Sequence, residues 1–115
     1  MNDKVSLPNT SVSTTIDADK GEPQALRIYA VKDPSGNSIG NPGETTHISV
    51  TLWGNDYPGR VGFIYDGPTQ LAPYQADSGG GFDVTVPLYS CTTYTFIVVP
   101  HGGAQPSLPW IVTRV

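Results

Sequence analysis

One stretch of the sequence decides the fold, and it reads Thr51-Leu52-Trp53-Gly54-Asn55-Asp56-Tyr57-Pro58-Gly59-Arg60-Val61-Gly62-Phe63-Ile64-Tyr65-Asp66-Gly67. An apolar strand ends near Leu52, turn-forming residues fill 54–59, and apolar residues alternate along a second strand over 61–65. Asp66 and Gly67 then supply the positive φ angles that a tight turn needs. This pattern predicts a β-hairpin within a small sandwich.

The same alternation continues on both sides of this stretch. It predicts seven strands, over 25–32, 46–54, 60–65, 70–75, 82–87, 93–99 and 110–115. Pro73 indicates an edge position for the fourth strand, because proline cannot donate to a ladder of hydrogen bonds. The segment 93–99 is the most hydrophobic and is expected at a sheet centre. Seven strands spaced about 12 residues apart are typical of an immunoglobulin-like sandwich.

The alternation also predicts which side chains form the core. Two inward rows are expected, and they consist of Leu26, Ile28 and Ala30 in the first strand and Ile48, Val50 and Leu52 in the second. Arg27, Tyr29 and Val31 are expected on the opposite face of the first strand.

Composition narrows the class of protein further. The chain has 115 residues, with 13 Gly, 11 Pro and a charged fraction of 14%, which favours one all-β domain over a helical one. Six basic residues and a net charge of −4 argue against nucleic acid as a partner. No apolar run approaches the roughly 20 residues that would span a membrane. We expect a monomer.

The two ends of the chain differ in character. Residues 1–23 are polar and are interpreted as a flexible leader or linker, and 24–115 as the sandwich domain. The leader has none of the features of a secretory signal peptide. Cys91 is the only cysteine, so no intramolecular disulfide forms.

From 26 to 115 the sequence resembles the bacterial Ig-like repeat modules of large surface and secreted proteins, notably those of pseudomonads. The phrases that carry the resemblance occur in the family's order: Val31-Lys32-Asp33-Pro34-Ser35-Gly36, then Asn41-Pro42-Gly43-Glu44-Thr45-Thr46, the stretch from Val50 to Gly67, Ala76-Asp77-Ser78-Gly79-Gly80-Gly81-Phe82, and Tyr94-Thr95-Phe96-Ile97-Val98. Phe82 stands where the family usually has Trp. The family normally occurs as tandem repeats, whereas this chain holds one copy.

The resemblance implies a non-catalytic module that acts as a spacer or adhesive unit, located outside the cell or at its surface as part of a larger protein. Its expected partner is a protein or a glycan at a cell surface. The alternative is a carbohydrate- or receptor-binding domain of a lectin-like or toxin-associated kind.

The candidate ligand-binding residues are Trp53, Asn55, Asp56 and Tyr57. Trp53 and Tyr57 bracket a turn, where aromatic rings can stack on sugars, and Asn55 and Asp56 between them can hydrogen-bond hydroxyl groups. The competing interpretation is that the aromatic residues pack across strands. Arg60 is close enough in sequence to pair with Asp56.

No arrangement of residues points to catalysis, a metal or a cofactor. His47 and His101 stand in no motif with Cys91, and the spacing of the aspartates matches no calcium loop. Aspartates in turns usually accept hydrogen bonds from the local backbone. We therefore predict that the chain is not an enzyme.

Overall fold

A computed structural model describes residues 26–115, and the predicted leader 1–23 lies outside these described residues. The described chain forms eight β-strands and no helix. They are β1 (Arg27–Lys32), β2 (Gly43–Thr45), β3 (Ser49–Asn55), β4 (Val61–Asp66), β5 (Thr69–Gln75), β6 (Gly81–Pro87), β7 (Thr92–Pro100) and β8 (Trp110–Arg114). Accordingly, no helix long and apolar enough to cross a membrane occurs in this part of the chain.

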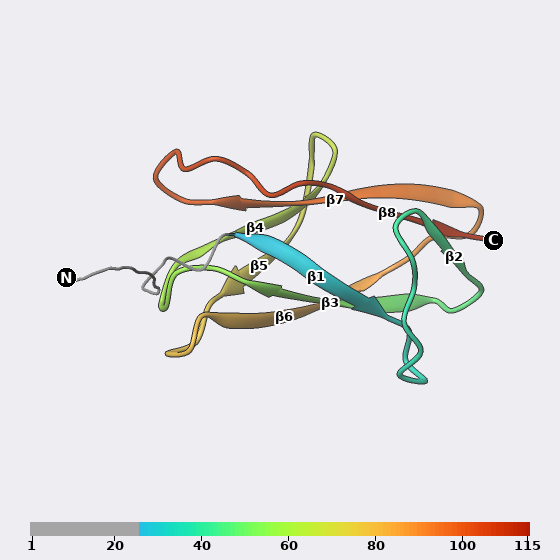
Figure 1. Cartoon of the computed structure of the whole chain (residues 1–115). Coiled ribbons are helices and arrows are strands. Elements are labelled where there is room, and N and C mark those ends of the chain that lie inside the picture. Colours follow the sequence, from blue (N-terminus) through green and yellow to red (C-terminus); the bar gives the residue numbers. More distant parts are fainter. Residues whose placement is uncertain (1–25) are drawn as a thin grey trace.

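The strands form two sheets packed face to face as a sandwich (Figure 1). One sheet has the order β1-β3-β6 and the other has the order β2-β8-β7-β4-β5. The all-β sandwich predicted from the sequence is confirmed. Seven strands were predicted, and the one not predicted is β2, which pairs in parallel with β8. With three residues, β2 is too short to show alternation.

The predicted hairpin between β3 and β4 is wrong. β3 pairs with β1 and β6, whereas β4 pairs with β5 and β7, so the two strands lie in different sheets. Residues 56–60 therefore cross from one sheet to the other. The tight turn after Asp66 does close a hairpin, between β4 and β5, and Gly67 has a φ of 54° there.

The core lies between the sheets and is built from alternate residues of each strand. Its fully buried large side chains include Leu52, Ile64, Phe96, Val98 and Val112. The predictions for sheet position hold, because β7 lies inside the five-stranded sheet and β5, which carries Pro73, lies at its edge.

Three predictions about which side chains face the core are wrong, those for Ile48, Ala30 and Val31. Ile48 is 68% exposed, because β3 begins only at Ser49 and Ile48 belongs to the preceding loop. Val31 is fully buried although it was expected on the outer face. An irregularity in the pairing of β1 with β3 between Ile28 and Ala30 shifts the alternation by one residue, so Val31 takes the inward position that was expected of Ala30, and Ala30 is only partly buried.

Candidate functional site

The candidate site is built on the crossing loop 56–60. Tyr57, Pro58, Gly59 and Arg60 form a tight turn in which the Arg60 N–H donates to the Tyr57 carbonyl at 3.0 Å. Pro58 occupies the second position of this turn, and Gly59 has a φ of 78° at the third. Both residue types suit a type II turn, which needs a positive φ at that third position.

A second loop holds the crossing loop in place. The N–H of Asp56 donates to the Gly80 carbonyl at 2.8 Å, and the N–H of Gly59 donates to the Ala76 carbonyl at 3.0 Å. In return, the Ala76 N–H donates to the Arg60 carbonyl at 2.9 Å. These three backbone hydrogen bonds join the β3–β4 connection to the β5–β6 connection at one end of the sandwich.

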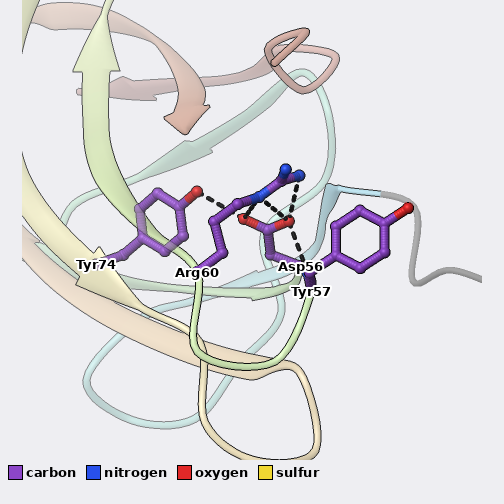
Figure 2. A network of polar contacts seen from close by, with 4 residues as sticks. All are labelled: Asp56, Tyr57, Arg60 and Tyr74. Carbon is purple, nitrogen blue, oxygen red and sulfur yellow. Dashed lines mark hydrogen bonds and ion pairs between the residues drawn. The ribbon is translucent and has the colours of Figure 1, made fainter. Parts of the chain in front are cut away.

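The Asp56 side chain is completely buried and accepts hydrogen bonds from three residues (Figure 2). Arg60 Nε lies 2.9 Å from Oδ1 and 3.0 Å from Oδ2, and Arg60 Nη2 lies 2.7 Å from Oδ1. The Tyr74 hydroxyl donates to Oδ2 at 2.7 Å, and the Tyr57 N–H donates to Oδ1 at 2.7 Å. The Asp56 carboxylate therefore stabilises the loop through these hydrogen bonds, and it has no exposed surface for a ligand.

The network lowers the pKa of Asp56 and raises the pKa values of Tyr74 and Arg60. Burial on its own would raise the pKa of Asp56, but the hydrogen bonds from Arg60, Tyr74 and the Tyr57 N–H outweigh it and hold that pKa below its ordinary value. Burial, followed by the hydrogen bond to Asp56, raises the pKa of Tyr74 well above the usual tyrosine value. The hydrogen bond to Asp56 raises the pKa of Arg60.

A glycine in β4 makes room for the Tyr74 ring. Gly62 faces the core opposite Tyr74, and a Cβ atom at this position would lie 2.8 Å from Tyr74 Cε1 and closer still to the Val99 carbonyl. Any larger residue would therefore displace the ring or the neighbouring strand. The absence of a side chain at Gly62 lets the Tyr74 hydroxyl reach Asp56.

Tyr57 is the exposed aromatic side chain of the loop. Its side chain is 46% exposed, and the Arg60 guanidinium carbon lies 4.8 Å from the centre of its ring. This distance is within the range of a cation–π interaction. Since Asp56 fixes the guanidinium, the loop presents a tyrosine ring held in a defined position beside a partly exposed arginine.

Trp53 and Asn55 lie elsewhere, on the outer face of the three-stranded sheet. They alternate along β3 with the buried residues Leu52 and Gly54. The Trp53 ring lies 5.9 Å from Lys32 Nζ, and its Nε1 is covered without a hydrogen-bond partner. The four candidate residues thus occupy two neighbouring environments, Trp53 and Asn55 on the sheet face and Asp56 and Tyr57 in the loop.

Sequence reasoning found part of this site. The pairing of Arg60 with Asp56 was expected from their spacing and is present. The roles of Tyr74 and Lys32 were missed. Tyr74 follows Asp56 by 18 residues and reaches it only through the packing of β5, and no local pattern in the sequence signals that contact.

The remaining candidates have structural partners. Asp33 accepts from the N–H groups of Ser35 and Asn37, and Asp77 accepts from those of Gly79 and Gly81, as expected of turn aspartates. His47 Nε2 lies 3.5 Å from Asp33 Oδ2, and the His101 ring lies 5.5 Å from that of Phe63. Cys91 is exposed. Within residues 26–115, no three His, Cys, Asp or Glu side chains gather as they would around a metal ion.

No protein-family model, curated protein or solved structure matches this chain.

Proposed function

We propose that the chain is a non-catalytic, immunoglobulin-like module of a bacterial surface or secreted protein, in which it acts as a spacer or adhesive unit. One observation carries the proposal. β1 starts beside the crossing loop, since Arg27 pairs with Asn55, and β8 ends at the opposite end of the sandwich, where Arg114 pairs with Thr92. The first strand therefore starts at one end of the sandwich and the last strand ends at the other, which is the geometry of modules joined in series.

The order of the strands supports the immunoglobulin-like assignment. In such domains the first, second and fifth strands share one sheet, and the third, sixth and seventh strands share the other. If the short β2 is set aside, β1, β3 and β6 correspond to the first group and β4, β7 and β8 to the second. The fourth strand, β5, pairs with β4 in the second sheet, whereas in constant-type domains the fourth strand lies in the first. The fold alone does not define a ligand, because such sandwiches serve many functions.

A head-to-tail trimer of the whole chain tests the serial arrangement. We expect all three copies to unfold in one cooperative transition within about 4 °C of the single chain, the shift that about 1 kcal/mol causes in a domain of this size. Misfolding of the joined copies, or a larger loss of stability, would overturn the proposal because it would mean that the two ends cannot be linked.

The second candidate function is carbohydrate or receptor binding, and the loop geometry favours it. A guanidinium has five N–H donors, and Asp56 engages two of them, the one on Nε and one on Nη2. The Arg60 side chain is 26% exposed beside the Tyr57 ring, so the loop combines a stacking surface with hydrogen-bond donors. Because Asp56 compensates the charge, this pair suits neutral hydroxyl groups better than anions.

A glycan array probed with the full chain tests this candidate. We expect a specific sugar signal that is lost in Tyr57→Ala and kept in Tyr89→Ala, whose tyrosine is 78% exposed at the other end of the sandwich. The variant Trp53→Ala shows whether the outer face of the three-stranded sheet also contributes to sugar binding. A signal that survives Tyr57→Ala would exclude the loop as the sugar site.

A further inference from the structure

The outer face of the five-stranded sheet is apolar although the described chain does not bury it in the core. Six side chains form this apolar face, and they are Val61, Phe63, Tyr65, Ile97, Val99 and Ile111. Pro73, on the edge strand β5, extends it opposite Phe63.

The alternation of burial shows that these side chains point away from the core. In β7 the buried residues are Tyr94, Phe96 and Val98, so Ile97 and Val99 lie on the other side of the strand. In β4 the buried positions are Gly62 and Ile64, which places the flanking residues outward. Val61 is exposed, and the other five side chains of the patch are partly buried, as expected when apolar neighbours on one sheet face cover one another.

The register brings the six residues together into one patch. Phe63 lies opposite Val99, and Tyr65 lies opposite Ile97, on the two central strands β4 and β7. Ile111 of β8 continues the patch on the other side of β7, opposite Thr95.

The patch is also uncharged. The segments that carry its six residues, 61–65, 97–99 and 111, contain no Asp, Glu, Lys or Arg. The charged residues of this sheet lie at its margins, at Glu44 on the edge strand β2, Asp66 at the end of β4 and Arg114 at the end of β8. The outer face of the three-stranded sheet is the opposite, since it carries Arg27, Lys32 and Asp83. A contiguous apolar patch of this kind on a soluble domain commonly marks an interaction surface.

We propose that the apolar face binds the same face of a second copy, so that the chain forms a symmetric dimer with its five-stranded sheets packed together. The six apolar side chains carry no charge, so two copies of the patch meet without like-charge repulsion, and apolar sheet faces pack at a spacing of about 10 Å. A sugar would find few free donors and acceptors at the patch, because the hydroxyls of Thr93 and Thr113 already bond to each other at 2.9 Å and the Tyr65 hydroxyl donates to Gln70 at 3.3 Å.

The size of the face sets the expected strength. A face about four strands wide and as long as β7, at about 4.8 Å between strands and about 3.3 Å per residue, covers up to about 570 Å². Two copies would bury up to about 1,100 Å², at the lower end of specific interfaces. We therefore expect a reversible dimer with a Kd in the micromolar range, in contrast to the monomer expected from the sequence.

Sedimentation of the full chain over a range of about 1 μM to about 1 mM tests the proposal. We expect a monomer–dimer equilibrium in which Ile97→Lys and Val99→Lys each raise the Kd by at least about tenfold, because each brings two lysines into the interface. The matched control Thr85→Lys places the same charge on an exposed position of the other sheet and should leave the Kd within about twofold.

Each outcome decides the proposal. A chain that stays monomeric at about 1 mM overturns it, whether the face remains free or is covered from within the chain. A dimer that tolerates lysine at residues 97 and 99 overturns it as well. Melting curves show that the variants fold, and if neither lysine variant folds, Ile97→Thr provides the same comparison with an expected rise in Kd of about fivefold.

Discussion

Asp56 and the apolar face depart from the usual distribution of residues in opposite directions. Asp56 is a fully buried carboxylate, whereas the face of β4, β7 and β8 displays apolar side chains outside the core. The carboxylate is surrounded by donors from Arg60, Tyr74 and the loop backbone. Among the described residues, the apolar side chains lie beside one another and beside Pro73 and His101 on the outer face.

The two regions differ in whether the interaction they need is already made within the chain: it is complete at Asp56 and incomplete at the apolar face. A buried charge is tolerated when hydrogen bonds replace its water, so the Asp56 network is self-sufficient and fixes the loop. An apolar patch loses contact with water only when another surface covers it. We therefore expect substitutions at Asp56 to alter stability, and substitutions in the apolar face to alter association while leaving stability nearly unchanged.

The largest expected effect is at Asp56. Asp56→Ala should lower the free energy of unfolding by about 3–5 kcal/mol, because it leaves the Arg60 guanidinium and the Tyr74 hydroxyl without their shared acceptor. Urea denaturation measures the change. Asp83→Ala, on the exposed face of β6, is the control and should stay within about 0.5 kcal/mol. Equal losses in the two variants would mean that Asp56 is not a buried, paired charge.

A smaller loss is expected at Tyr74, the neutral donor of the network. Tyr74→Phe should cost about 2 kcal/mol, the range of a hydrogen bond to a charged group, and the ring should keep its packing against Phe82. Denaturation in urea provides the value, and Tyr65→Phe is the control because its hydroxyl bonds at the exposed surface. If Tyr74→Phe left the free energy of unfolding unchanged, Tyr74 would contribute to stability through packing alone.

The same network should be visible in the pH dependence of stability. The pKa of Asp56 is lower in the folded state, so its contribution is fully present above the unfolded value of about 3.9 and is lost as the pH falls from there through the folded pKa. The stability difference between the wild-type chain and Asp56→Asn should therefore shrink as the pH falls below about 4. Chemical denaturation of both chains at a series of pH values measures this difference, and parallel curves would contradict the assignment.

The fold was predictable as far as it depends on local periodicity. Alternation and turn residues identified the long strands, the central place of β7 and the edge place of β5. Local pattern could not assign strands to sheets, and for this reason β3 and β4 were predicted as a hairpin. It also could not foresee the irregular pairing after Ile28 that turns Val31 inward.

The candidate site was predictable only where its contacts are local. Asp56 and Arg60 are four residues apart and their pairing was expected, but the depth of Asp56 depends on Tyr74 and on the glycine at 62. Trp53 and Tyr57 are also four residues apart, but β3 ends between them at Asn55. Trp53 therefore lies on a sheet face and Tyr57 lies in a loop. The apolar face escaped prediction for a related reason, since its residues come from three strands that are adjacent only in the folded sheet.

The smallest expected effect provides the sharpest comparison, between neighbouring residues of β7. Val98 is fully buried, and Val98→Thr should cost about 1–3 kcal/mol because it places a hydroxyl in the core. Ile97→Thr keeps a β-branched residue on the outer face and should cost less than about 1 kcal/mol when the protein is dilute enough to be monomeric. Urea denaturation at low protein concentration measures both. If Ile97→Thr cost as much as Val98→Thr, residue 97 would be covered within the monomer itself, and the apolar face would belong to the same class of completed interaction as Asp56.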